Sequence, residues 1–319
     1  LASVWTITPT MIETAAYFFI MGLWLHQLRN RSRRGLLTAS LLTLLLACSF
    51  TRGLWLHLPG QRTEAAFLDV GQGSSSLLTL AGGTAILIDG GSNTSPHFDI
   101  GKRVIAPFLW HKRLWRLDEV VITHPDSDHY NGLAFIIRRF SPKRLWINGD
   151  RMKHYPYQRL LALAAESGME LMVPEQGEVL AEDLRARVGF VAGATPAASE
   201  DLSVNDRSLV LKARHGQVSF LFPGDIGSRG EQLLLASGAD LSAEVLLAPH
   251  HGSSGSSSPQ FIRAVDPDIV VVSSGRSVRG SYYAQEHRQK WLEAGRKVLA
   301  TVEQGTVTIT TDGRELFIE

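Results

Sequence analysis

The chain has 319 residues, with 32 Lys and Arg against 31 Asp and Glu and a formal net charge of +1. This length accommodates one large domain and an appendage, and the balanced charge neither favours nor excludes nucleic acid as a partner. The single cysteine, Cys48, excludes an internal disulfide framework and a cysteine zinc cluster. Because the chain starts at Leu1 rather than Met, we expect it to be a fragment of a longer protein.

Two apolar segments near the start of the chain predict two transmembrane helices within residues 1–60. Residues 11–28 are apolar apart from Glu13 near the start and two polar residues near the end. Residues 36–50 are apolar again, and counting on through Leu54-Trp55-Leu56 brings the second segment to the roughly 20 residues that span a bilayer. A soluble helical hairpin buried on the main domain is the alternative.

The loop between these segments, residues 29–34, holds four arginines and no acid. The positive-inside rule places such a loop in the cytoplasm, so residues after about 60 would lie on the far side of the membrane. In a bacterium with two membranes that side is the periplasm. A plain solvated turn, the alternative interpretation, leaves the orientation open.

Residues 61–319 alternate short apolar runs with helical patterns and predict an α/β domain. The first runs are separated by glycine-rich turns, which is typical of an antiparallel meander. Expected strands cover 65–70, 76–80, 85–89, 119–122, 186–191, 208–213, 218–222, 244–248, 269–273 and 306–311, and expected helices 100–110, 132–140, 157–167 and 285–294. Strands first, then strands mixed with helices, predict two packed sheets with helices outside, an αββα sandwich.

The most informative segment follows the expected strand at 119–122 and precedes a helix. It contains His124, Asp126, Asp128 and His129. Imidazole nitrogen and carboxylate oxygen are ligands that hold zinc or manganese, so the segment predicts a metal site at a strand-to-helix loop. A polar turn that caps the helix is the alternative.

Three more groups of polar residues come directly after apolar runs. Asp89 and Asp225 each end one run, and His250-His251 follow another. Strand ends gathered at one edge of a sandwich form a rigid platform for a site. A lone Asp after a strand is more often a turn residue, but several such groups in one order favour a shared site.

This order of residues, from Asp89 through the 124–129 segment and Asp225 to His250-His251, resembles the metallo-β-lactamase superfamily. The short sequence segments at residues 67–73, 88–91, 205–210 and 248–253 are similar to segments in the C-terminal domain of the ComEC family of competence channel proteins. The resemblance covers residues 61–319. It implies a metal-dependent nuclease on the outer face of the bacterial inner membrane that degrades one DNA strand while the other is transported. Expected partners are DNA, the inner membrane, and the DNA receptor and translocation ATPase of the competence machinery.

The resemblance also implies roles for individual residues. The metal ligands would be His124, Asp126, Asp128, His129, Asp225 and His251. Asp126 or Asp128 would accept the proton of the attacking water, and His250 would either contact the phosphate or lie behind the ligands. Asp89 and Asn205 would orient the ligands. One or two divalent ions are expected, manganese or zinc, and the share of carboxylate oxygen favours manganese.

Three departures from the family pattern leave alternatives open. The superfamily's middle histidine has no counterpart between Asp128 and Asp225, and Asn205 lies in that region. Ser74 stands where many family members carry Asp, and residues 274–282 lack the histidine common there. The alternatives are a metallo-hydrolase of another ester and a catalytically weak domain that binds and guides DNA.

Basic residues predict where DNA would bind. Arg276, with Arg279, lies in a loop that follows an expected strand, and Ser253 lies in a serine- and glycine-rich loop able to offer backbone donors to phosphate. Two further clusters are Lys112, Arg113 and Arg116, and Arg138, Arg139, Lys143 and Arg144. A solvated helix face is the alternative for each of these two clusters.

Overall fold

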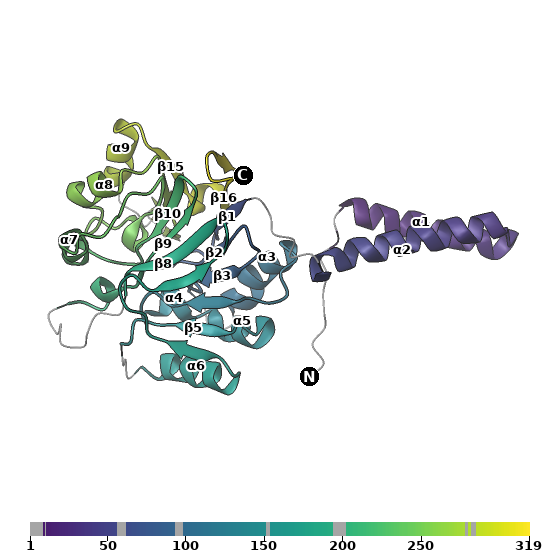
Figure 1. The fold of residues 1–319 in the computed structure, drawn as a ribbon, viewed down its shortest axis with the longest axis horizontal. Helices are drawn as coiled ribbons and strands as arrows, with labels where there is room; N and C mark the ends of the chain where they lie inside the picture. The colour runs from purple at the N-terminus through teal and green to yellow at the C-terminus, as the bar shows by residue number, and fades with distance from the viewer. Residues whose placement is uncertain are drawn as a thin grey trace. The chain divides into compact units, whose positions relative to one another are not determined.

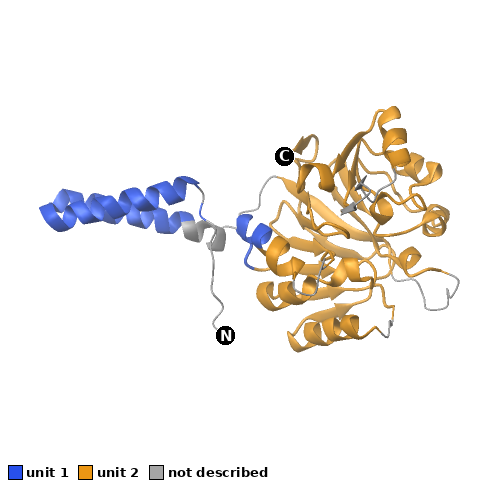
Figure 2. Ribbon diagram, turned by 180° about the vertical axis from the view of Figure 1, so that it is seen from behind, with its two compact units in different colours: residues 1–58, 107–115 blue, residues 59–106, 116–319 orange. Residues whose placement is uncertain are grey.

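The computed structural model describes residues 9, 11–55, 62–92, 98–150, 154–193, 202–277, 280–281 and 285–319. For residues 50–55, 276–277 and 280–281 it describes the backbone only. The chain divides into two compact units, one of residues 1–58 with 107–115 and one of residues 59–106 with 116–319 (Figure 2).

The larger unit is built on two mixed sheets (Figure 1). The strand order of the first sheet is β17 (Leu316–Ile318), β16 (Val307–Thr311), β1 (Thr63–Phe67), β2 (Ser76–Thr79), β3 (Ala85–Ile88), β4 (Glu119–Val121), β5 (Arg144–Trp146) and β6 (Glu170–Met172). That of the second is β15 (Lys297–Ala300), β12 (Ile269–Val272), β11 (Val245–Leu247), β10 (Val218–Phe222), β9 (Val210–His215), β8 (Ala186–Ala192) and β7 (Val179–Glu182). A separate ribbon pairs β13 (Arg276–Ser277) with β14 (Gly280–Ser281).

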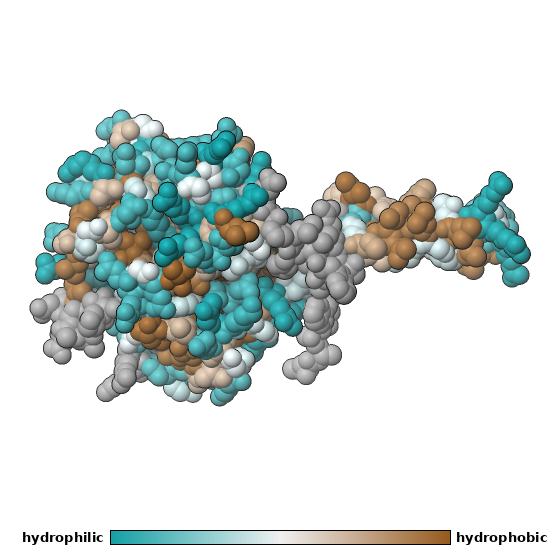
Figure 3. All heavy atoms as spheres, in the orientation of Figure 1, coloured by the Kyte–Doolittle hydropathy of each residue, from teal (hydrophilic) through white to brown (hydrophobic). Residues whose placement is uncertain are grey.

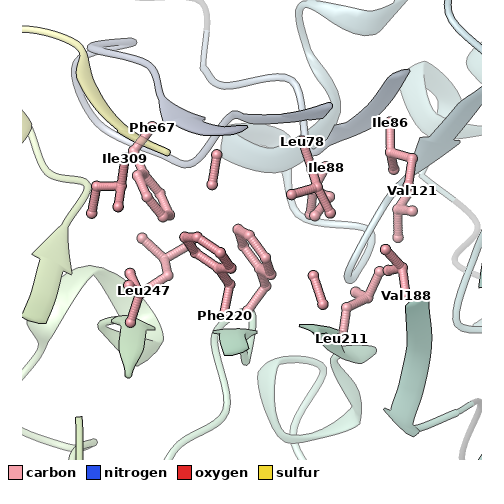
Figure 4. Close-up of a cluster of buried hydrophobic side chains, with 14 of the residues drawn as sticks. Phe67, Leu78, Ile86, Ile88, Val121, Val188, Leu211, Phe220, Leu247 and Ile309 are labelled. Carbon is pink, nitrogen blue, oxygen red and sulfur yellow. The ribbon is translucent and has the colours of Figure 1, made fainter. Parts of the chain in front are cut away.

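The core lies between the two sheets, and side-chain alternation along the strands produces it. In β10, Phe220 and Phe222 belong to the cluster between the sheets, whereas Leu221 belongs to the cluster beneath the outer helices. Phe67 of β1 stacks on Phe222 across the interface, with ring centroids 5.8 Å apart. Figure 4 shows these apolar side chains interdigitating from both sheets. A strand that is apolar on both faces is expected when each face is covered.

Helices cover the outer faces of both sheets. Before residue 170 the chain forms η1 (Gly101–Ile105), α3 (Ala106–His111), α4 (Ser127–Tyr130), α5 (Leu133–Phe140) and α6 (Tyr155–Glu166). Later come η2 (Asn205–Arg207), α7 (Ser228–Ala236), η3 (Pro249–Gly252), α8 (Pro259–Val265), α9 (Gln285–Glu293) and α10 (Thr301–Gln304). Leu234 of α7, Phe261 of α8 and Trp291 of α9 pack on the outer face of the second sheet. The predicted αββα sandwich is confirmed.

The strand directions bring the polar strand ends together. β1, β2 and β3 form the predicted antiparallel meander, and β3, β4, β5 and β6 then run parallel. In the second sheet β10, β11 and β12 are parallel. In sheets with parallel strands, binding sites lie beyond the carboxyl ends of those strands. Asp89, the 124–129 segment, Asp225 and the His250-His251 pair follow β3, β4, β10 and β11, respectively.

The smaller unit contains a hairpin of two helices, α1 (Met11–Asn30) and α2 (Arg33–Trp55). Trp24 donates from Nε1 to Thr43 Oγ1 at 3.0 Å, and Ser49 Oγ donates to Glu13 Oε1 at 2.5 Å. Glu13 also forms an ion pair of 2.6 Å with Arg113. Apolar side chains line much of the visible surface of the hairpin (Figure 3).

The two N-terminal helices form as predicted. Within the described ranges of the chain, no helix is long and apolar enough to cross a bilayer. The second predicted segment was counted through residue 56, which lies outside the described residues.

Substitution of Phe220 by Ala tests the assignment of the core. Phe220 is 1% exposed, and its removal leaves a cavity between two sheets that cannot close without moving strands. We expect the free energy of unfolding to fall by about 3–5 kcal/mol in chemical denaturation followed by circular dichroism. Leu184→Ala, at a fully exposed side chain, should change it by less than about 0.5 kcal/mol. A loss at Phe220 no larger than that of the control would contradict the assignment.

Candidate metal centre

Close backbone packing holds α4 at the edge of the sandwich. The turn between β1 and β2 passes directly behind Asp128, and a Cβ on Gly73 would overlap the Asp128 carbonyl oxygen. The Ser74 N–H donates to that same oxygen at 3.2 Å. The Gly90 N–H, just after β3, donates to the His129 carbonyl at 2.6 Å. Gly73 is therefore required because α4 lies against its backbone, and Gly90 because the Leu133 side chain packs against it.

Four side chains from both sheets converge in one buried cluster. They are Asp128 and His129 on α4, Asp225 after β10 and His251 in η3, and one potential ligand atom from each lies within 4.8 Å of all the others. Asp225 Oδ2 lies 3.2 Å from His251 Nε2 and 3.3 Å from His129 Nε2. Asp128 Oδ2 lies 3.5 Å from His251 Nε2.

His124 and Asp126 adjoin the cluster through Asp225. His124 Nε2 lies 3.5 Å from Asp126 Oδ2 and 4.0 Å from Asp225 Oδ2. The His124 side chain is fully buried, whereas that of Asp126 is 40% exposed. All six predicted ligands therefore gather in one place, with Asp126 at the solvent side.

Asp89 fixes the orientation of His129. Its Oδ2 lies 2.8 Å from His129 Nδ1, and its carboxylate accepts the backbone N–H of Thr123 at 2.8 Å and the Thr123 hydroxyl at 2.9 Å. A carboxylate behind a ligating imidazole sets the tautomer that presents the other ring nitrogen to a metal. The orienting role predicted for Asp89 agrees with these contacts.

The other two imidazoles are held in the same manner and leave the same atom without a partner. His251 Nδ1 lies 3.0 Å from the Ser273 carbonyl oxygen, and His124 Nδ1 lies 3.2 Å from a hydroxyl. The Nε2 atoms of His124, His129 and His251 are buried, and none has a hydrogen-bond partner among the described residues. Three buried nitrogens that converge on carboxylates without hydrogen bonds fit a divalent cation.

Electrostatic coupling within the cluster stabilises its charged forms. Burial disfavours imidazolium, but the carboxylates of Asp225 and Asp128 raise the pKa of His251 to about 9. The pKa of His129, also opposed by burial, is raised well above its usual range by Asp225 and Asp89. Burial likewise favours a neutral Asp128, but the His251 imidazole, 3.5 Å away, and the charge of His129 lower its pKa to about 2. Protons on the histidines therefore occupy the place a cation would take.

Asn205 supports the turn that carries Asp225. Its carbonyl oxygen accepts the Ser208 hydroxyl at 2.7 Å, and that hydroxyl oxygen accepts the Asp225 N–H at 3.1 Å. Its side-chain Nδ2 lies 3.4 Å from His250 Nε2. Asn205 therefore acts behind the ligands, as the resemblance implied, although it contacts His250 rather than a ligand.

Two consecutive left-handed residues separate the roles of His250 and His251. Their φ angles are +50° and +54°, a conformation that costs on the order of 1–3 kcal/mol for a residue other than glycine. The turn directs His251 into the cluster and leaves His250 half-buried outside it. The role of His250 in catalysis stays a prediction.

The predicted DNA contacts are described only in part. Arg276 begins β13, but its side chain lies outside the described residues, as does all of Arg279. Ser253 Oγ accepts the Gly255 N–H at 3.4 Å. In the basic clusters, Lys143 pairs with Asp118 at 2.8 Å and Arg144 with Glu119 at 2.5 Å.

The sequence analysis missed residues whose side-chain carboxylates hold the backbone of loops near the cluster. Glu231 of α7 is fully buried and accepts the N–H groups of Ser257 and Ser258, which holds the loop after His251. Asp206 accepts the N–H groups of Gly227 and Gly230, each at 2.9 Å. The only available signal was an acid in a polar segment, which does not distinguish such roles from solvated positions.

Comparison with known proteins gives consistent results. A family model described as the metallo-β-lactamase superfamily matches residues 68–276. ComE operon protein 3 of Bacillus subtilis is 30% identical over 76% of the chain and 32% of its own length. Competence protein ComA of Neisseria gonorrhoeae is 27% identical over 78% of the chain and 32% of its own length. The chain thus spans about a third of these relatives. Among solved structures, a mutant of the β-hydroxylase CmlA aligns with a TM-score of 0.51 at 15% identity, covering 77% of this chain and 53% of that chain.

Metal affinity should rise with pH. The pKa of His251 is raised to about 9, so near neutral pH this imidazole is protonated and must lose its proton before it can bind a metal. We expect the apparent dissociation constant for Mn²⁺ or Zn²⁺ to fall about tenfold per pH unit up to that pKa for each proton displaced. Competition with a metallochromic indicator calibrated at each pH measures it. A metal affinity that does not change over that pH range would contradict the ligand set.

Asp89→Asn should weaken metal binding without unfolding the protein. The amide can still accept from Thr123 but no longer offers a carboxylate to His129 Nδ1. We expect a loss of about 10–100-fold in metal affinity, measured by isothermal titration calorimetry. Asp268→Asn, at an exposed position, serves as the control. Equal affinities in the two variants would show that Asp89 does not tune the histidine.

Proposed function

Because the chain belongs to the metallo-β-lactamase superfamily and its hydrolase domain is related to competence proteins, we propose that it is a metal-dependent nuclease that hydrolyses the phosphodiesters of DNA. Membership of this family supports the general assignment of the chain as a metal-dependent hydrolase. The substrate, the identity of the metal and the cellular setting are the further content of the proposal.

The convergence on Asp225 is the observation that carries it. Three buried imidazole nitrogens face its carboxylate at 3.2 to 4.0 Å, with the carboxylates of Asp126 and Asp128 beside them. Nitrogen and oxygen donors in this proportion suit zinc or manganese, and a carboxylate shared among several ligands suits either one ion or two. The share of oxygen donors leads us to propose manganese before zinc.

The chain's own residues prepare the hydrolysis. A bound divalent ion would lower the pKa of a water molecule and offset the charge of the phosphate. Asp89 and the Ser273 carbonyl hold the imidazoles so that Nε2 faces the cluster. Asp126, with its side chain 40% exposed, lies where solvent reaches the cluster and can accept a proton from the attacking water.

The relationship to competence proteins is the basis on which we propose DNA as the substrate. One of the relatives is named a competence protein and the other a ComE operon protein. We extend the proposal to the setting that this relationship implies, at the periplasmic face of the inner membrane beside a DNA receptor and a translocation ATPase. Degradation of the strand that is not transported would be the reaction there.

A second candidate is a domain that binds and guides DNA with little catalysis. It is favoured by the ligand set, in which the described residues between Asp128 and Asp225 supply no further histidine to the cluster. A hydrolase of another ester is a third candidate, because fold alone does not fix the substrate.

Measurement of metal content together with DNA cleavage decides among them. The full chain, loaded in turn with Mn²⁺ and Zn²⁺, should cleave DNA, and Asp225→Asn should lose bound metal and about 100-fold or more of the activity, because the shared carboxylate is gone. The exposed Asp268→Asn is the matched control and should keep both.

The alternatives predict different outcomes of the same assay. Bound metal with turnover of a small ester but no DNA cleavage favours another hydrolase. Absence of bound metal with retained, salt-sensitive DNA binding favours the guiding domain. Cleavage that survives Asp225→Asn unchanged would refute the proposed site.

A further inference from the structure

A groove lies between α5 and α6 on the outside of the first sheet, where the two helices run side by side (Figure 1). Its volume is about 480 Å³. Both helices contribute to its lining, with Arg138 from α5 and Arg159 from α6, and Tyr130, Asn131 and Glu166 line it as well.

The direction of the helices places one end of the groove beside the metal centre. β4, β5 and β6 are parallel, and α5 and α6 are the connections between them. Each helix therefore begins at the edge where the strands end, which is the edge that carries the cluster. Tyr130 directly follows the ligand His129 and lines this near end, while Glu166 ends α6 far from it. The helix N-termini add partial positive charge at the near end.

The groove carries two exposed cations. Arg138 and Arg159 are both exposed, and neither forms an ion pair with an acid in the parts of the chain that the structure describes. By contrast, Lys143 and Arg144, which come from the same basic cluster of the sequence, are paired with acids. The structure thus separates the cations available for phosphate from those already neutralised.

An exposed aromatic ring accompanies these cations. Tyr155, the first residue of α6, is 69% exposed, and the guanidinium carbon of Arg159 lies 5.9 Å from its ring centroid. A track of positive charge with an aromatic platform is the arrangement that binds single-stranded nucleic acid, because phosphates meet cations and bases stack on rings. Packed helices lie about 8–10 Å apart, so the groove between them admits one strand and not a duplex.

We propose that this groove, with Arg138 and Arg159 in its lining and Tyr155 beside Arg159, binds a single strand of DNA that leads into the metal centre. The two arginines contact successive phosphates and Tyr155 stacks on a base. The inference rests on the proposed function in one respect, that the bound strand is the one hydrolysed, while binding itself can be measured without catalysis.

The first test is binding of a fluorescein-labelled 20-mer of thymidine to the full chain by anisotropy, in EDTA to prevent cleavage. Arg138→Ala/Arg159→Ala should raise the dissociation constant by about tenfold or more and reduce the salt slope by about 0.7 for each phosphate that is no longer neutralised. Lys143→Ala/Lys290→Ala removes the same charge from exposed, acid-paired lysines, and we expect it to change neither quantity beyond about twofold.

Substitution of Tyr155 provides an independent test of single-strand binding. Tyr155→Ala should weaken binding by about tenfold, and Tyr155→Trp should retain it, because either ring can stack on a base. Equal binding by the arginine double variant and its lysine control, no binding by the wild-type chain, or equal affinity for duplex and single strand would each overturn the proposal.

A small substrate separates this proposal from the proposed function. Bis(p-nitrophenyl) phosphate is a diester too short to occupy the groove, so its hydrolysis by the metal-loaded chain should be unchanged in the arginine double variant. Cleavage of the oligonucleotide should show a raised KM with a similar kcat. If the wild-type chain hydrolyses neither substrate, the nuclease assignment fails while the binding experiment still decides on the groove.

Discussion

A buried carboxylate surrounded by imidazoles is the constraint on which the rest of the site depends. Asp225 is 4% exposed, and its Oδ2 lies within 4.0 Å of three Nε2 atoms. An unpaired charge at such depth costs several kcal/mol, so its partners must be held in place by the fold rather than recruited from solvent. Nearly every polar contact around the cluster serves this end, from the Asp89 carboxylate behind one imidazole to the Ser208 hydroxyl beneath the Asp225 backbone. The same demand explains the strained turn at His250-His251, which a more relaxed loop could not replace without moving a ligand.

The two sheets contribute unequal parts to this arrangement. The first sheet supplies α4 and its acid-rich loop, and the second supplies the shared carboxylate and His251. The aromatic contact between Phe67 and Phe222 lies in the core that sets the spacing of the sheets. Each of these residues ends a strand that leads into a loop at the site. Core packing therefore also determines the geometry of the potential metal ligands, because a shift of one sheet against the other moves half of them.

The sequence predicted the sandwich and the ligand residues because both leave local patterns. Alternating apolar runs marked most of the long strands, and ligand-type side chains stood directly after them. The strands β5, β6 and β7 were not among the expected strands, and α7 escaped because it opens on Gly227-Ser228-Arg229-Gly230, which is a turn pattern. The network behind the ligands escaped for another reason. Thr123 and Glu231 bond to atoms distant in sequence, and spacing along the chain carries no record of such pairs.

The position of the last strands has a consequence for the order in which the molecule is made. β16 pairs with β1, which the ribosome releases more than 200 residues earlier, so this part of the first sheet forms only after β16 has been made. The edge of β1 stays open until then, while the ligands on α4 wait for Asp225 and His251 to emerge. Assembly of the cluster and closure of the sandwich thus depend on segments that are made long after α4, and a nascent chain that ends at α4 holds only part of the cluster.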